Sequence, residues 1–144
     1  MRMTPREANT ILVVDDDPDT REVLELAVSM EGYSVRLAED TATALEILAA
    51  CSPAMVFLDY YGIGEDTAKL VEHVRSANRA TPIVLMTGAK DPARKARALG
   101  LKNFLPKPFD FDALRKLLHG QGETRKTFAR ACSHSRSLDF CLFS

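Results

Sequence analysis

The stretch Ile11-Leu12-Val13-Val14-Asp15-Asp16-Asp17-Pro18 places four apolar residues directly before three carboxylates and a proline. An apolar run of this length is too short for a buried helix and is typical of a strand covered on both faces, as in parallel sheets. Asp17 before Pro18 indicates a helix start, because aspartate caps a first turn well and proline is favoured at the first helical position. The stretch therefore predicts a buried strand that leads directly into a helix.

The same succession of short apolar runs and amphipathic stretches recurs along the chain. Further strands are expected at Ser34–Leu37, Met55–Leu58, Ile83–Met86 and Asn103–Leu105. Helices are expected at Pro18–Met30, Thr41–Ala50, Asp66–Ala77, Pro92–Leu99 and Asp110–His119. The first helix should bury one apolar face, made of Val23, Leu24, Leu26, Ala27 and Met30. Five β-α units predict an α/β fold, a doubly wound (βα)5 sandwich with a central five-stranded parallel sheet.

Composition limits the class of protein. The chain has 144 residues, 46% hydrophobic and 27% charged, which suits one globular domain. A net charge of −1 gives no support for nucleic-acid binding, which depends on many basic side chains. The three cysteines lack metal-ligand spacing, no apolar run approaches a membrane span, and residues 1–10 contain no secretory signal. We therefore expect a cytoplasmic protein that binds neither nucleic acid nor membranes.

The repeating pattern defines the expected domain boundaries. Residues 10–119 carry all of it and should form one domain, preceded by a polar extension over residues 1–9. From Gly120 onward the periodicity stops, and residues 120–144 are too few for a separate DNA-binding domain. Within this tail Leu138, Phe140, Leu142 and Phe143 alternate weakly with polar residues. We expect the tail to be either flexible or a docking segment.

Side chains that could bind a metal ion or react with a phosphoryl group follow four of the expected strands. They are Asp15 and Asp16 after the first, Asp59 after the third, Thr87 after the fourth and Lys107 after the fifth. The carboxyl ends of parallel strands meet at one edge of the sheet, where such folds bind ligands. Clustered carboxylates suit the hard cation Mg²⁺, and a carboxylate can attack phosphorus to form an aspartyl-phosphate. A hydroxyl and an ammonium can contact the phosphate oxygens, so the set predicts a Mg²⁺-dependent phosphoacceptor.

Four segments carry a resemblance to a known family. They are ILVVDDD at 11–17, MVFLD at 55–59, MTG at 86–88 and LPKPF at 105–109. In this order they resemble the landmarks of bacterial two-component response-regulator receiver domains, over roughly residues 10–119. The resemblance implies the flavodoxin-like fold of a stand-alone, chemotaxis-regulator-like receiver. It also implies a signalling function in a phosphorelay rather than that of an enzyme with its own substrate.

The resemblance implies a role for each residue of the metal and phosphoacceptor site. Asp59 would be the phosphoacceptor, and Asp15 and Asp16 the acidic pair, with Asp16 the more direct Mg²⁺ ligand. The backbone carbonyl of Tyr61 would be a further metal ligand. The phosphoryl donor would be a sensor histidine kinase or a histidine phosphotransfer protein, and the output an unidentified protein partner; homodimerisation stays open.

The resemblance also implies a switch. Thr87 would be the switch hydroxyl, Lys107 the partner of the phosphate, and Phe104 the aromatic residue that turns inward on activation. A cis peptide bond is implied at Lys107–Pro108, since a bond before proline adopts the cis form at little cost.

The loop after the phosphoacceptor departs from the family pattern. Ile63 stands where the family usually has proline and Thr67 where it has glycine, while Tyr61 is unusually bulky. This loop is the support for an alternative function, a phosphorylation-independent pseudo-receiver that acts as a protein-interaction module. A phosphatase with an aspartate nucleophile would need an acid at position 61, and a flavin-binding protein would need a hydroxyl-rich loop in place of the three aspartates. We expect neither of these.

Overall fold

The computed structural model describes residues 9–60, 64–77 and 80–120. Its strands are β1 (Thr10–Val14), β2 (Ser34–Ala38), β3 (Met55–Asp59), β4 (Ile83–Thr87) and β5 (Asn103–Pro106). Its helices are α2 (Pro18–Met30), α3 (Thr41–Ala50), α4 (Gly64–Ala77), α5 (Pro92–Ala98) and a further helix, named here the final helix, over residues 111–120. The predicted bounds differ from these by at most two residues, which is the usual uncertainty of element ends.

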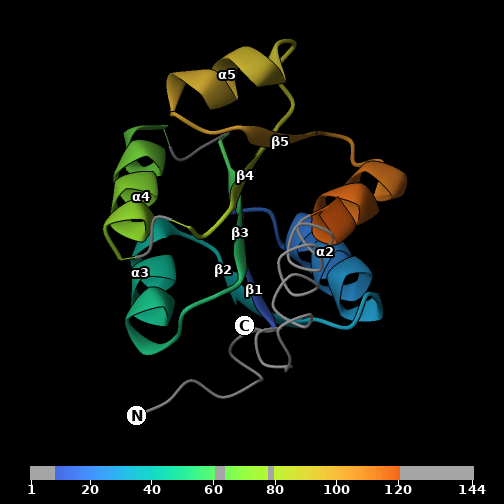
Figure 1. The fold of residues 1–144 in the computed structure, drawn as a ribbon, viewed down its shortest axis with the longest axis horizontal. Coiled ribbons are helices and arrows are strands. Elements are labelled where there is room, and N and C mark those ends of the chain that lie inside the picture. The colour runs from blue at the N-terminus through green and yellow to red at the C-terminus, as the bar shows by residue number, and fades with distance from the viewer. Residues whose placement is uncertain (1–8, 61–63, 78–79, 121–144) are drawn as a thin grey trace, which may run out of the picture.

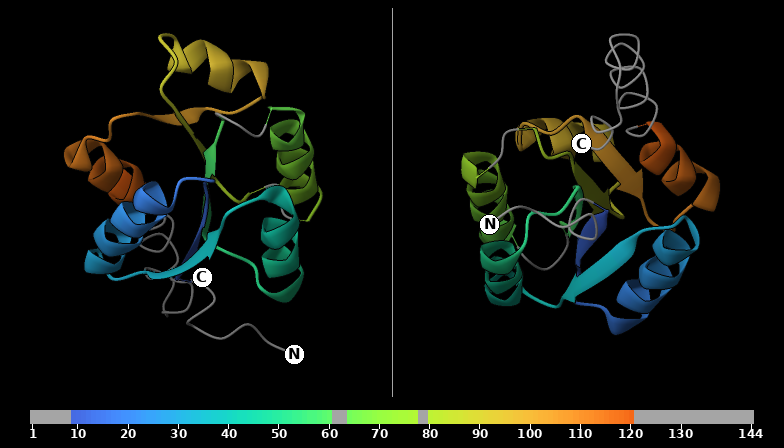
Figure 2. Two further views of the ribbon diagram at one scale, coloured as in Figure 1. Left: turned by 180° about the vertical axis from the view of Figure 1, so that it is seen from behind. Right: turned by 60° about the horizontal axis from the view of Figure 1, so that its bottom comes forward.

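One parallel sheet lies at the centre of the domain. Its strand order is β2-β1-β3-β4-β5, so the chain moves outward in one direction from β1 and then in the other. Helix α2 and the final helix cover one face, while α3, α4 and α5 lie on the other (Figure 1). The reverse view in Figure 2 shows the same two layers of helices around the sheet. The predicted doubly wound α/β sandwich is confirmed.

Strand position decides how much of each strand is covered. All residues of β1, β3 and β4 are buried, as the continuous apolar runs predict. Strand β2 differs: Ser34 and Arg36 are exposed and only Ala38 is fully buried. This strand is at the edge of the sheet, so its pattern alternates between covered and exposed side chains.

The predicted apolar face of α2 is wrong in part. Leu24 and Val28 are fully buried against the sheet, and Val28 was not among the expected residues. Leu26 and Met30 are 65% and 75% exposed, and Val23 is 42% exposed. The helix carries two overlapping apolar stripes, and only the one with Leu24 and Val28 contacts the sheet. The other stripe lies on the outside of the domain.

The register of the sheet aligns the ends of three strands. Asp59 of β3 pairs with Met86 of β4, and Thr87 of β4 pairs with Pro106 of β5. The residue that follows β5, Lys107, therefore comes to the same edge as Asp59 and Thr87. The peptide bond Lys107–Pro108 is cis, as predicted. Within the described residues, no helix has both the length and the apolar character required to cross a membrane.

Candidate functional site

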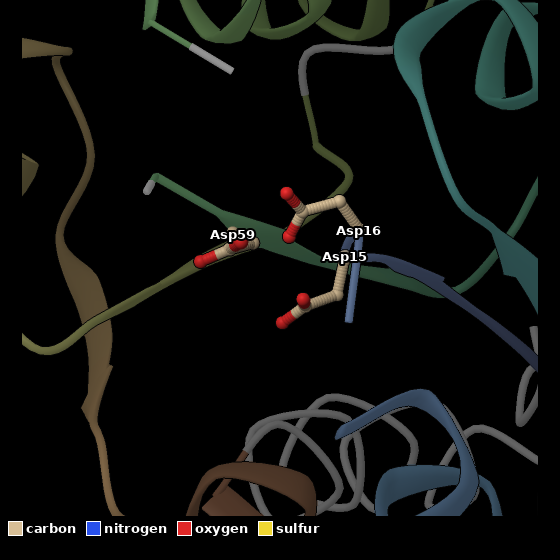
Figure 3. Close-up of side chains that lie close together, drawn as sticks. All are labelled: Asp15, Asp16 and Asp59. Atoms are coloured by element: carbon tan, nitrogen blue, oxygen red, sulfur yellow. The ribbon is translucent and has the colours of Figure 1, made fainter. Parts of the chain in front are cut away.

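Three carboxylates meet at the carboxyl edge of the sheet. Asp15 and Asp16 follow β1, and Asp59 ends β3; Figure 3 shows the three side chains gathered around one point. One carboxylate oxygen from each lies within 4.8 Å of the others. Asp15 and Asp59 are buried, with 0% and 1% exposure, whereas Asp16 is open to solvent. Three oxygen ligands at this spacing, one of them facing water, fit a hard divalent cation such as Mg²⁺.

Lys107 supplies the positive charge of the site. Its Nζ lies 3.0 Å from Oδ2 of Asp15 and 3.0 Å from Oδ1 of Asp59. Burial of the ammonium opposes its charged form, but the hydrogen bonds and attraction to both carboxylates outweigh burial and raise the pKa of Lys107. The lysine is therefore charged at neutral pH and partly balances the two buried carboxylates.

The loop between β1 and α2 holds Asp15 in place. The backbone N–H of Asp17 donates to Oδ1 of Asp15 over 2.9 Å, and Arg21 donates through Nη1 to the Asp15 carbonyl over 2.7 Å. Asp17 caps α2, as predicted, because its carboxylate accepts from the N–H of Asp19 and the hydroxyl of Thr20. The hydroxyl of Thr20 and this cap lower the pKa of Asp17. Sequence reasoning missed Arg21, although its place one turn after the cap was a usable signal.

The two residues assigned to the switch lie on neighbouring strands. Thr87 ends β4 with 2% exposure, and its Oγ1 accepts a hydrogen bond of 3.0 Å from the backbone N–H of Ala89. The N–H of Lys107 donates to the Thr87 carbonyl over 2.9 Å, which ties β5 to the end of β4. Phe104 on β5 is half-buried and packs against the core between the sheet and α3–α5. Thr87 therefore lies at the edge of the sheet that carries the site, whereas Phe104 lies opposite Leu85 of β4 and keeps part of its surface exposed.

Part of the loop after Asp59 lies outside the described residues. This applies to Tyr61, the expected carbonyl ligand, and to Ile63. Tyr60 is described, and the ammonium of Lys95 on α5 lies over its ring, with Nζ 5.1 Å from the ring centre. The sequence did not predict this cation–π contact. Thr67, in the place of the family glycine, is fully buried in α4.

The comparisons with known proteins agree with this geometry. Residues 11–119 match the family model described as the response regulator receiver domain. The response regulator MprA of Mycolicibacterium vanbaalenii is 37% identical over 106 residues, which cover 72% of this chain and 46% of that protein. The regulatory protein AtoC of Escherichia coli is 32% identical over 112 residues, 76% of this chain and 24% of that protein. The chain thus spans less than half the length of these curated relatives.

Solved structures give the same result. The receiver domain of NtrX from Brucella abortus has a TM-score of 0.70 and 32% identity, over 79% of this chain and 98% of that one. The chemotaxis protein CheY4 of Vibrio cholerae has a TM-score of 0.68 and 28% identity, over 76% and 95%. TrrA of Thermotoga maritima, in complex with Mg²⁺ and BeF, has a TM-score of 0.69 and 27% identity, over 78% and 97%. The chain therefore belongs to the response-regulator receiver domains, the signalling domains of two-component phosphorelays.

Proposed function

We propose that this receiver accepts a phosphoryl group on Asp59 and that residues 10–119 form the unit that does so. One observation supports this most directly: a single ammonium, that of Lys107, lies 3.0 Å from both Asp15 and Asp59. Asp59 is the one of these two carboxylates that ends a central strand, beside Thr87 on β4. A nucleophile with a cation and a hydroxyl next to it is suited to phosphoryl transfer, which depends on positioning and charge neutralisation.

Asp15, Asp16 and Asp59 would hold Mg²⁺, with the carbonyl of Tyr61 as a further ligand. The residues fit this ion because they offer three clustered carboxylate oxygens and no soft ligand. When bound, Mg²⁺ supplies positive charge that offsets the carboxylates and the incoming phosphoryl oxygens. Lys107 alone leaves this cluster of three carboxylates with a net negative charge, which would repel a phosphoryl donor.

The residues of the chain would act as follows. An oxygen of Asp59 forms a bond to phosphorus while the bond from phosphorus to the donor breaks, and the electron pair leaves with the donor. Lys107 would then contact an oxygen of the new phosphoryl group instead of the Asp59 carboxylate. Thr87, whose Oγ1 accepts from Ala89, still has its hydroxyl proton to donate to another of these oxygens. The domain would thus promote its own phosphorylation and dephosphorylation.

Movement of Thr87 toward the phosphoryl group would carry the signal to the surface. Phe104 lies on the neighbouring strand and is only half-buried, so it can turn inward when the Thr87 side chain moves. The phosphoryl donor would be a sensor histidine kinase or a histidine phosphotransfer protein, and a downstream protein partner or a second copy would recognise the changed surface. No comparison supports the phosphorylation-independent pseudo-receiver.

Intact-mass measurement after incubation with acetyl phosphate and Mg²⁺ tests this function. We expect one added phosphoryl group in the parent, and none after Asp59→Asn or in the presence of EDTA. Asp66→Asn, an exposed aspartate on α4, is the matched control and should be phosphorylated like the parent. If the parent takes up no phosphoryl group and also fails to bind beryllofluoride with Mg²⁺, the proposal is wrong and the pseudo-receiver is the better description.

A further inference from the structure

An apolar groove lies between α2 and the final helix. These two helices cover one face of the sheet (Figures 1 and 2). It is a hollow of about 420 Å³, and its apolar lining consists of Val23, Leu26, Ala27, Met30, Phe111 and Leu114. Four of these side chains are the large hydrophobic residues with the greatest exposure in the described residues: Val23, Leu26, Met30 and Phe111. A contiguous apolar patch of this kind marks a surface that another segment covers.

The groove is closed at one end by a charged cluster. Glu31, directly after α2, accepts from Nε2 of His119 over 2.9 Å and from Nε of Arg115 over 3.4 Å. These contacts link the end of α2 to the final helix. The groove is therefore part of the folded domain, and a segment that fills it finds a preformed site.

The other end of the groove is acidic. Asp19 and Glu22 lie one helical turn before Val23 and Leu26, so both carboxylates flank the apolar lining. Both are exposed, and within the described residues neither takes part in an ion pair. A segment that combines apolar side chains with basic ones would match this surface on both counts.

The chain itself contains such a segment. Residues 121–144 follow the final helix directly, and their apolar residues include Phe128, Leu138, Phe140, Leu142 and Phe143. Their four basic residues, Arg125, Lys126, Arg130 and Arg136, outnumber the two acidic ones, Glu123 and Asp139. The final helix spans about 15 Å, whereas the seventeen residues from 121 to 137 can extend over about 55 Å, so the apolar end of this segment can reach the whole groove.

We propose that residues 121–144 dock into the groove between α2 and the final helix. The apolar residues near position 140 cover Leu26, Met30 and Phe111, while the basic residues lie near Asp19 and Glu22. Attachment to the final helix favours this occupant over a second copy, because a short tether gives an effective concentration of about 1 mM. A segment that binds as a free peptide with a Kd of about 0.1 mM would then be docked about 90% of the time.

A spin label on Cys141 tests the docking in the full chain. Cys51→Ala and Cys132→Ser leave this thiol as the labelled position, and backbone amide signals are compared with the label oxidised and reduced. We expect the oxidised label to reduce the signals of residues 23–30 and 111–115 at least twofold. Leu26→Glu should remove this effect, because it places a charge in the groove at a side chain that is 65% exposed and not needed for folding.

Two controls decide between the tail and other occupants. Ala68→Glu, at another exposed position on α4, should leave the signal loss unchanged. Mixing spin-labelled chain with unlabelled, isotope-enriched chain should give no loss, since the contact is within one molecule. Loss in the mixed sample that equals the loss within one chain would overturn the proposal in favour of a second copy. Unaffected groove signals in the singly labelled chain would overturn it in favour of a separate partner protein.

Discussion

Replacing Lys107 by methionine removes the ammonium that lies between two buried carboxylates and keeps most of the length of the side chain. The ammonium is 3.0 Å from each of Asp15 and Asp59, whose side chains are 0% and 1% exposed, while that of Lys107 is 24% exposed. At an effective dielectric constant of about 20, each pair attracts by about 5–6 kcal/mol, and the loss of water around all three groups opposes this. Breaking a buried pair costs about 3–5 kcal/mol, and we expect about 3 kcal/mol because Lys107 is partly exposed.

Urea unfolding followed by far-ultraviolet circular dichroism measures this loss, in a buffer with EDTA at neutral pH. The chain has no tryptophan, so a fluorescence signal from that residue is not available. A loss of about 3 kcal/mol would lower the midpoint by about 1.5–2 M at an m value near 1.5–2 kcal/mol/M. Lys102→Met, at an exposed lysine before β5, is the matched control and should change the free energy of unfolding by less than about 0.5 kcal/mol.

The pH dependence gives the reasoning a second, independent test. A raised pKa of Lys107 means that its stabilisation is fully present below the unfolded value of 10.5 and is lost as the pH rises through the folded pKa. In the Lys107→Met variant this pH-dependent contribution is absent. The difference in the free energy of unfolding between parent and variant should therefore be constant near neutrality and shrink as the pH rises above 10.5 and through the folded pKa of Lys107. Equal stability at neutral pH, or a difference that does not shrink at alkaline pH, would refute the role given to the ammonium.

Three further predictions concern the rest of the domain. Leu24→Ala should lower the free energy of unfolding by about 2–5 kcal/mol, since Leu24 is fully buried, whereas Leu26→Ala should change it by less than about 0.5 kcal/mol in the same urea experiment. Mg²⁺ at ten times its Kd should stabilise the parent by about 1.4 kcal/mol in thermal unfolding, and Asp16→Asn should reduce this gain more than it changes the stability without Mg²⁺. The backbone N–H and hydroxyl of Thr43 lower the pKa of Asp40 in the folded protein. The ionised carboxylate therefore contributes to folding stability above the unfolded pKa of 3.8, and this contribution is lost as the pH falls through the folded pKa. Asp40→Asn should accordingly weaken the dependence of the free energy of unfolding on pH in the acid range.

The sequence was sufficient for the fold because local and long-range signals agree. Each central strand is a continuous apolar run, and aspartates cap α2, α3 and α5 at their first turns. The buried side of α2 could not be predicted in the same way. Leu24 with Val28 and Leu26 with Met30 have the same helical spacing, and only contact with the sheet and the final helix distinguishes them. Which of the two stripes is buried depends on tertiary packing, which cannot be derived from the sequence of the helix alone.

For the site, too, the order of strands and helices in the sequence predicts some features and leaves others undetermined. Parallel strands bring Asp15, Asp59, Thr87 and Lys107 to one edge, and this follows from the order of β and α segments alone. That Lys107 lies between two carboxylates depends on the register of β4 with β5, where Thr87 pairs with Pro106. A shift by one residue would turn the lysine to the other face of the sheet. The contact of Lys95 with the Tyr60 ring could not be predicted either, because it depends on where α5 packs against the sheet.

The different surroundings of Asp15 and Asp16 explain why we assign them unequal parts in holding Mg²⁺. Both oxygens of Asp15 are engaged, one by the N–H of Asp17 and the other by Lys107, and the side chain is fully buried. Asp16 is exposed, and within the described residues no hydrogen bond or ion pair holds its carboxylate. A cation that approaches from water can therefore exchange a water ligand for an Asp16 oxygen without breaking a contact in the protein, whereas Asp15 must share an oxygen already bound. Asp15 would thus stabilise the site through Lys107, and Asp16 would be the carboxylate that binds the metal directly.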